Sequence, residues 1–164
     1  MTASNADDLG EAQARRLENV SEQLTLLLRQ PDVARRLRAA AGEVEWSAMQ
    51  IFGHLVEMVP YWLGQCRVLL TAAEPPTFGR ELDAPERMAG PERGASGDME
   101  GLLGLWHANV TTATQTIRQM SAVERSMKGQ HVRRGEMTVA DIVEFFIVAH
   151  AEEHLAQMRA ALQI

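Results

Sequence analysis

Four long segments of this chain repeat apolar residues with the period of an α-helix, and this pattern limits the fold more than any other feature. In the first segment the apolar positions lie three, four and seven residues apart, namely Leu17, Val20, Leu24, Leu27 and Leu28. The alternating pattern of a half-buried strand is scarce, and aromatic residues, which strands favour, make up only 5% of the chain. The sequence therefore predicts an all-α protein.

Residues that start or end helices bound the first two predicted helices. The first is expected from about Asp8 to Gln30, because Pro31 cannot continue it. The second is expected from Ser47 to about Ala73, since Ser47 and Gln50 stand three residues apart in the pattern of a capping box.

Two irregularities are expected in this half of the chain. Residues 32–45 should form a short helical turn followed by a connector around Gly42. Pro60 lies inside the second helix, where its ring removes one internal hydrogen bond. We therefore expect a kink or a break near Glu57 rather than a straight helix.

Two more amphipathic helices are expected in the second half. One runs from about Asp98 to Met120 and carries an apolar stripe of Met99, Leu102, Leu103, Trp106, Val110, Ala113 and Ile117. The other begins at Thr138, where Asp141 follows three residues later as at an N-cap, and continues to the C-terminus. Four helices that must each bury one face predict a four-helix bundle, as a single domain over residues 1–164.

The connector between the second and third helices, from Glu74 to Gly97, is dense in proline, glycine and charge. This composition predicts a loop without helix or strand. Its roughly 24 residues could span about 80 Å when extended, whereas the preceding helix is only about 40 Å long. The connector can therefore return the chain to the starting end, so that the second and third helices run parallel.

Charge and cysteine content exclude several classes of protein. Sixteen Lys and Arg against 22 Asp and Glu give a formal charge of −6, which lacks the basic field that direct nucleic-acid binding requires. A single cysteine, Cys66, permits no intrachain disulfide and is expected to be a small packing residue. The sequence has no apolar run of membrane-spanning length and no signal-peptide pattern, so we expect a cytoplasmic protein without a membrane partner.

Three histidines lie on predicted apolar helix faces. His150 and His154 are four residues apart, which stacks their rings one helical turn apart, close enough to share a metal ion. His54 lies on the apolar face of the second helix. Each ring could equally be an ordinary buried histidine, but an antiparallel second and fourth helix would bring all three to similar levels.

These residues resemble a known family. Trp46-Ser47, His54-Leu55 with Glu57, the run 135–138 and the string His150-x-x-x-His154-Leu155-x-Gln157 are similar to the DinB-like (damage-inducible) superfamily of metal-binding four-helix bundles. The resemblance implies an up-down-down-up bundle with a long crossover, and a divalent metal ion held by His54, His150 and His154. One position departs from the family, because the residue after the first histidine of the last helix, commonly acidic, is Ala151.

A three-histidine site leaves coordination positions open, as catalytic rather than structural metal sites do. Imidazole ligands suit zinc or nickel. The superfamily includes thiol-dependent transferases and isomerases and presumed hydrolases. The resemblance thus implies a metal-dependent hydrolase or thiol (S-)transferase acting on a small-molecule substrate, with a low-molecular-weight thiol as a candidate cosubstrate. The alternative is a non-catalytic interaction or structural bundle whose histidines fill the core or hold a structural metal.

Several further residues are weaker candidates. Glu57 could orient the imidazole of His54 or could be an ordinary carboxylate on the helix surface. His131, expected in a loop, could reach over the site and donate a proton. Glu153 completes the H-x-x-E-H string of inverted zinc peptidases, in which it would be the general base, but those enzymes need a further ligand well downstream. Tyr61 and Gln157 share the histidine faces and could line a pocket or simply pack. Met- and Ala-rich faces make a homodimer plausible.

Overall fold

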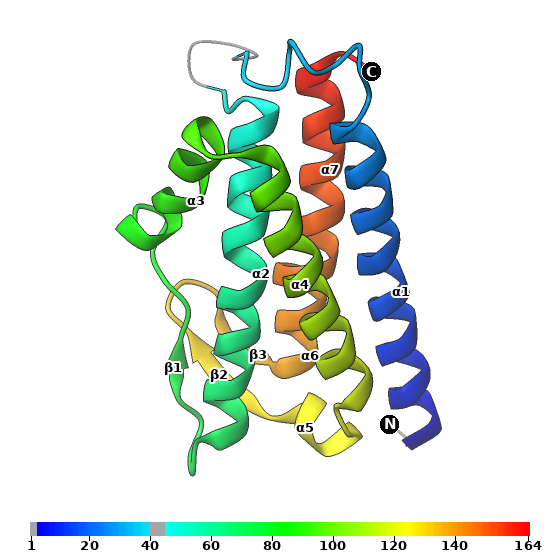
Figure 1. The fold of residues 1–164 in the computed structure, drawn as a ribbon. Helices are drawn as coiled ribbons and strands as arrows, with labels where there is room; N and C mark the ends of the chain where they lie inside the picture. Colours follow the sequence, from blue (N-terminus) through cyan, green and yellow to red (C-terminus); the bar gives the residue numbers. More distant parts are fainter. Residues whose placement is uncertain (1–2, 40–44) are drawn as a thin grey trace.

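The computed structural model describes residues 3–39 and 45–164 and is built around four long helical segments (Figure 1). Three of them are single α-helices, and the fourth consists of three consecutive helical pieces. The bounds are α1 Ala3–Leu28, α2 Ala48–Thr71 and α4 Met99–Gln119, followed by α6 Val139–Asp141, η1 Ile142–Val148 and α7 Ala149–Leu162. The predicted four-helix bundle is confirmed.

The direction of the helices follows the expected up-down-down-up order. In Figure 1, α1 and α7 run upward, while α2 and α4 run downward. The helices α2 and α4 are therefore parallel, and α2 and α7 are antiparallel. This antiparallel pair is the condition under which His54 approaches the two histidines of the last helix.

The ends of the helices are fixed by the side chains that the sequence indicates. The hydroxyl of Ser47 accepts a hydrogen bond from the backbone N–H of Gln50, and the backbone N–H of Ser47 donates to the side chain of Gln50, which completes a capping box. Thr138 and Asp141 form the same pair of bonds at the start of α6. Residues 31–38 form turns, as expected, whereas the connector around Gly42 lies outside the described residues. The first helix already begins at Ala3, ahead of the expected Asp8.

The helix α2 continues through Pro60 without the break that the sequence suggests. The ring of Pro60 leaves the carbonyl of Val56 without its helical donor. The side-chain amide of Asn109 on α4 donates to this oxygen at 2.9 Å. A neighbouring helix thus supplies the hydrogen bond that proline removes.

The expectation of a plain loop from Glu74 to Gly97 is wrong for most of its second half, where α3 spans Pro85–Ser96. This helix packs closely against α2 through glycines, as a Cβ atom on Gly53 would lie 2.2 Å from the carbonyl oxygen of Gly90. Close backbone packing against α2 stabilises a helix that its proline and glycine content disfavours. Sequence composition alone does not report such a tertiary contact.

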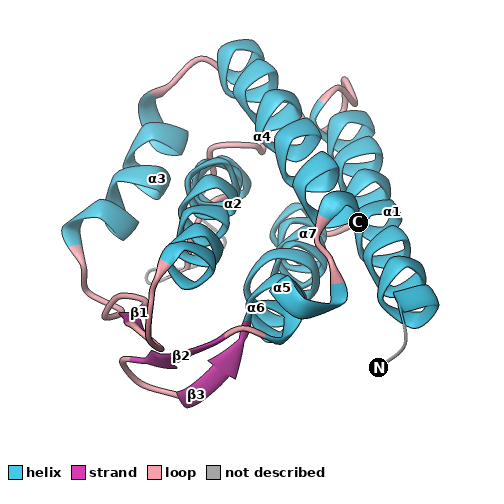
Figure 2. Ribbon diagram, turned by 90° about the horizontal axis from the view of Figure 1, so that it is seen from below, coloured by secondary structure: helices cyan, strands magenta, loops and turns pink. Residues whose placement is uncertain are grey.

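Three short strands, β1 Thr77–Phe78, β2 Lys128–His131 and β3 Gly135–Thr138, form a small sheet that the sequence analysis did not predict (Figure 2). Strand β1 pairs with β2 in parallel, and β2 pairs with β3 in antiparallel register, with Lys128 opposite Thr138. Gly135 adopts a φ of 82° at the turn into β3, a conformation that glycine adopts without strain. Strands of two to four residues are too short to give a visible alternating pattern.

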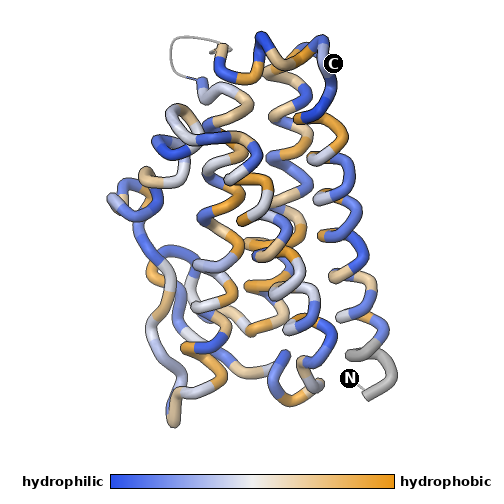
Figure 3. Tube along the Cα trace, viewed as in Figure 1, coloured by the Kyte–Doolittle hydropathy of each residue, from blue (hydrophilic) through white to orange (hydrophobic). Residues whose placement is uncertain are grey.

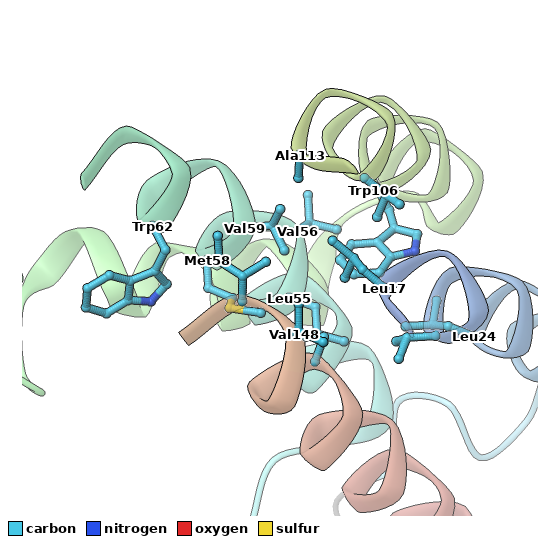
Figure 4. Packing of buried hydrophobic residues seen from close by; sticks show 14 of the residues in the cluster. Leu17, Leu24, Leu55, Val56, Met58, Val59, Trp62, Trp106, Ala113 and Val148 are labelled. Carbon is cyan, nitrogen blue, oxygen red and sulfur yellow. The ribbon is translucent and has the colours of Figure 1, made fainter. Parts of the chain in front are cut away.

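The core lies between the long helices. Hydrophobic and hydrophilic positions alternate along α1 in the manner of an amphipathic helix (Figure 3). Leu17 and Leu24 of α1 point toward Leu55 and Val56 of α2 and toward Trp106 of α4 (Figure 4), and all five are buried. No helix in the described part of the chain is long and apolar enough to cross a membrane.

Candidate metal centre

The side chains of His54, His150 and His154 converge between α2 and α7. Nε2 of His150 lies 3.0 Å from Nε2 of His154 and 3.4 Å from Nε2 of His54. One ring nitrogen from each residue falls within 4.8 Å of the others. The three residues that the sequence singled out therefore meet at one point.

The last helix presents its histidines just after a π-helix. Residues Ile142–Val148 form η1, and α7 begins immediately afterwards at Ala149. A π-helix closes i→i+5 hydrogen bonds and often occurs at functional sites. A π-helix turns through a smaller angle per residue than the 100° of an α-helix. Helix faces predicted from 100° per residue therefore do not apply across residues 142–148. Within α7 the i, i+4 spacing of His150 and His154 places both rings on one face, as expected.

Burial keeps the three imidazoles neutral. Burial, together with the neighbouring charges of His154 and His150, lowers the pKa of His54 to about 2. Burial likewise lowers the pKa of His150 to about 4. It also lowers the pKa of His154, although the hydrogen bond that His154 donates to Gln157 raises this pKa. Near pH 7 the rings therefore offer lone pairs rather than positive charge.

The environment of His154 also sets its tautomer. Its Nδ1 donates to the side-chain oxygen of Gln157 at 2.8 Å, which leaves Nε2 without a proton and facing the other two rings. Gln157, a candidate for lining a pocket, thus lies behind His154. Nδ1 of His54 is buried without a hydrogen-bond partner in the described residues.

This donor set fits a divalent metal ion. Two nitrogens bound at about 2.1 Å to one tetrahedral ion lie roughly 3.4 Å apart, close to the two separations between the Nε2 atoms. Neutral imidazoles whose lone pairs face one another repel unless a proton or a cation lies between them. Neutral imidazole nitrogens that meet at one point can serve as ligands of a divalent metal ion.

The carboxylate of Glu57 pairs with an arginine rather than with His54. It accepts hydrogen bonds from both terminal nitrogens of Arg80, at 2.6 and 2.7 Å, whereas Nδ1 of His54 is 3.9 Å away. The guanidinium of Arg80 in turn lies 3.8 Å from the ring centroid of Tyr61. Glu57 and Tyr61 therefore hold Arg80, and the hydrogen bond through which Glu57 could have oriented His54 is not formed.

The other two acid–base candidates lie at the margin of the site. Glu153 is 76% exposed at its side chain, and its carboxylate lies 3.8 Å from Nδ1 of His150. His131 lies in strand β2 rather than in a loop, and its buried ring stacks on Phe146. Its Nδ1 accepts hydrogen bonds from the backbone N–H groups of Arg133 and Arg134. His131 thus supports the β2–β3 turn rather than reaching over the histidines.

A cavity of about 250 Å³ opens beside the histidines, with His54 and His150 in its wall. Four arginines from the two connectors also line it, namely Arg80, Arg87, Arg133 and Arg134. These arginines were not predicted from the sequence, because the 74–97 connector and the segment around His131 were both expected to be loops. Two features of the sequence could have indicated them, namely the high charge of the 74–97 connector and the adjacent pair Arg133-Arg134.

Fold and site together define a four-helix bundle with an open cavity above three convergent histidines. The sequence model of the DinB superfamily matches residues 10–158, and the chain belongs to this superfamily. Among solved structures it is similar to YfiT from Bacillus subtilis, described as a probable metal-dependent hydrolase with an unusual four-helix bundle topology. The two share 18% sequence identity with a TM-score of 0.79, over 99% of this chain and 89% of that one. No curated protein sequence matches.

Proposed function

We propose that this protein holds one divalent metal ion on His54, His150 and His154 and acts on a small molecule as a metal-dependent hydrolase or thiol transferase. The observation that carries the proposal is the convergence of three neutral imidazole nitrogens beside a cavity. A structural ion is normally enclosed by four protein ligands, whereas three ligands and an adjacent cavity leave room for a substrate. YfiT, which has a similar fold, is described as a probable metal-dependent hydrolase, which supports the first of these two reaction classes.

Zinc or nickel is the proposed ion, and it would supply Lewis-acid activation of a group bound beside it. The chain's own residues prepare the site in three ways. Burial keeps the imidazoles unprotonated, Gln157 fixes the tautomer of His154, and the aromatic rings of Trp62 and Phe146 form an apolar wall of the cavity. A low-molecular-weight thiol is the proposed cosubstrate if the reaction is a transfer.

The proposal predicts a sharp loss of metal binding in His154→Ala. Because one of three ligands is lost while the packed helices remain, metal affinity should fall by orders of magnitude with little change in helical content. The measurement is metal content after reloading with zinc or nickel, alongside circular dichroism. His107→Ala, at an exposed histidine of α4 outside the cluster, should load like the wild type.

Wild-type loading in His154→Ala would contradict the ligand assignment. Turnover is tested separately on the loaded wild-type protein with a panel of esters and amides, and with a small thiol plus an electrophile. Metal binding without turnover of any panel member would favour the non-catalytic bundle over an enzyme.

A further inference from the structure

The cavity beside the histidines carries more positive than negative charge, although the chain as a whole has a formal charge of −6. Its ionisable lining other than histidine consists of Arg80, Arg87, Arg133, Arg134, Glu81 and Glu153. Arg80 is already neutralised, because it binds both oxygens of Glu57. Three arginines thus remain at the cavity for some other anion.

These three arginines have no carboxylate partner within the described ranges 3–39 and 45–164. Arg87 donates to the backbone oxygen of Leu82 at 3.0 Å. The guanidinium of Arg134 lies 5.1 Å from the ring centroid of Phe146. Burial lowers the pKa of Arg87, and the charges of Arg80 and Arg133 lower it further against the opposing charge of Glu57, so a bound anion would stabilise the charged form of Arg87.

The two chain segments that carry these arginines, α3 and the β2–β3 turn, are both packed against the bundle. Arg87 lies on α3, and a Cβ atom on Gly90 of that helix would come 3.1 Å from Cα of His54. Arg133 and Arg134 lie in the β2–β3 turn, where their backbone N–H groups donate to His131. Two separate connectors therefore place their cations at the same cavity.

The rest of the cavity wall is apolar. The rings of Trp62 and Phe146 stack with their centroids 4.0 Å apart and nearly parallel, and both line the cavity. Its volume of about 250 Å³ is below the roughly 300–1,000 Å³ of sites for drug-sized ligands. The cavity thus suits a small molecule that is apolar at one end and anionic at the other.

We propose that this cavity binds a small molecule with one carboxylate and an apolar body. The guanidinium groups of Arg87, Arg133 and Arg134 donate hydrogen bonds to the carboxylate, a pairing that their planar geometry favours. The apolar body lies against Trp62 and Phe146. The binding of this molecule does not depend on the proposed function. Its role as the substrate does rest on the proposed function.

Calorimetric titration of the metal-free full chain tests this carboxylate-binding site, called the subsite below, without any contribution from a metal ion. The probes are phenylacetate and phenylacetamide, which have similar shapes and differ in charge. Phenylacetate should bind at least about ten times more tightly than the amide, and its affinity should fall as salt is added. Arg87→Gln and the double variant Arg133→Gln/Arg134→Gln should each weaken phenylacetate binding about tenfold. Arg67→Gln, at an exposed position of α2 outside the cavity, should have no effect.

Three results would overturn the subsite: no phenylacetate binding at millimolar concentration, equal affinity for acid and amide, or unchanged affinity in folded arginine variants. Inorganic phosphate is the third probe, and tighter binding of phosphate than of phenylacetate would also overturn the carboxylate assignment. Zinc binding is measured separately on the same preparations. If phenylacetate binds through the arginines but the chain takes up no zinc, the proposed function is refuted and the carboxylate site stands. If the chain takes up zinc but does not bind phenylacetate, the carboxylate site is refuted and the proposed function stands.

Discussion

At the scale of single residues, Gln157 has the clearest role around the candidate metal centre. Its side-chain oxygen accepts a hydrogen bond from Nδ1 of His154 at 2.8 Å. Nε2 of that ring is therefore unprotonated and faces the other two histidines. Hydrogen bonds of this kind orient metal-bound histidines and raise their basicity.

Gln157→Ala should weaken zinc binding about 10–100-fold without unfolding the chain, because it removes an orienting group and leaves all three imidazoles in place. Competition with a chromophoric chelator measures the affinity. Gln115→Ala, an equivalent change at an exposed position of α4, is the control. Equal zinc affinity in the two variants would show that Gln157 plays no part in the site.

Individual residues were predictable from sequence where their helix places them. The i, i+4 spacing on an apolar face selected His150 and His154, and the apolar face of the second helix added His54. The family resemblance then implied that all three bind one metal ion. The arginines of the cavity were not predictable in this way, since they come from two connectors whose folding depends on contacts with α2 and on the small sheet. The role of Gln157 was missed because spacing alone cannot distinguish a pocket-lining side chain from one that orients a ligand.

At the scale of elements, the docking of α3 on α2 depends on the absence of side chains. A Cβ atom on Gly53 would meet the carbonyl oxygen of Gly90 at 2.2 Å and the backbone nitrogen of Gly94 at 2.6 Å. Because these are backbone atoms, no side-chain rotation can make room. The place of Arg87 at the cavity therefore depends on a glycine one residue before His54.

Gly53→Ala should lower the free energy of unfolding by about 1–3 kcal/mol, the usual cost of overpacking, as α3 must move away. Gly64→Ala in the same helix is the matched control, because nothing lies within 4 Å of its added Cβ. That variant should gain up to about 1 kcal/mol from reduced backbone freedom in the unfolded chain. Urea denaturation measures both, and a Gly53→Ala protein as stable as Gly64→Ala would contradict the close packing.

The long helices were predictable because each carries a long periodic stripe, and capping residues such as Ser47 and Thr138 mark where two of them begin. The short elements were not. Strands of two to four residues give no period, and α3 forms where its own proline and glycine content argues against a helix. The continuity of α2 at Pro60 also depends on a partner that is distant in sequence, Asn109.

At the scale of the whole molecule, buried neutral histidines link folding to pH. Burial lowers the pKa of His54 to about 2 and of His150 to about 4, and it lowers the pKa of His154 and His131 as well. In the unfolded chain these groups titrate near pH 6.5. Below that pH the unfolded chain binds more protons than the folded one, so the stability present above pH 6.5 is lost toward pH 4.

The Tm of the metal-free protein should therefore fall by at least about 3 °C between pH 7.5 and pH 5, which corresponds to roughly 1 kcal/mol for a chain of this size. Differential scanning calorimetry at several pH values measures this slope. His54→Gln should flatten it. A Tm that stays constant over this range in the wild type would show that the buried imidazoles are not held neutral.

The bundle topology was predictable because the 74–97 connector is long enough to return the chain along α2. That return makes α2 and α4 parallel and leaves α2 antiparallel to α7, which brings His54 level with the histidines of the last helix. Chain connectivity thus determines whether three distant imidazoles can meet.

The central claim is that one divalent ion lies at the meeting point of these imidazoles. A crystal structure of protein loaded with zinc and grown without chelator, with anomalous scattering recorded at the zinc edge, tests it most directly. We expect one anomalous peak about 2.0–2.1 Å from Nε2 of His54, His150 and His154. A peak elsewhere, or three rings with no ion between them in zinc-soaked crystals, would contradict the account.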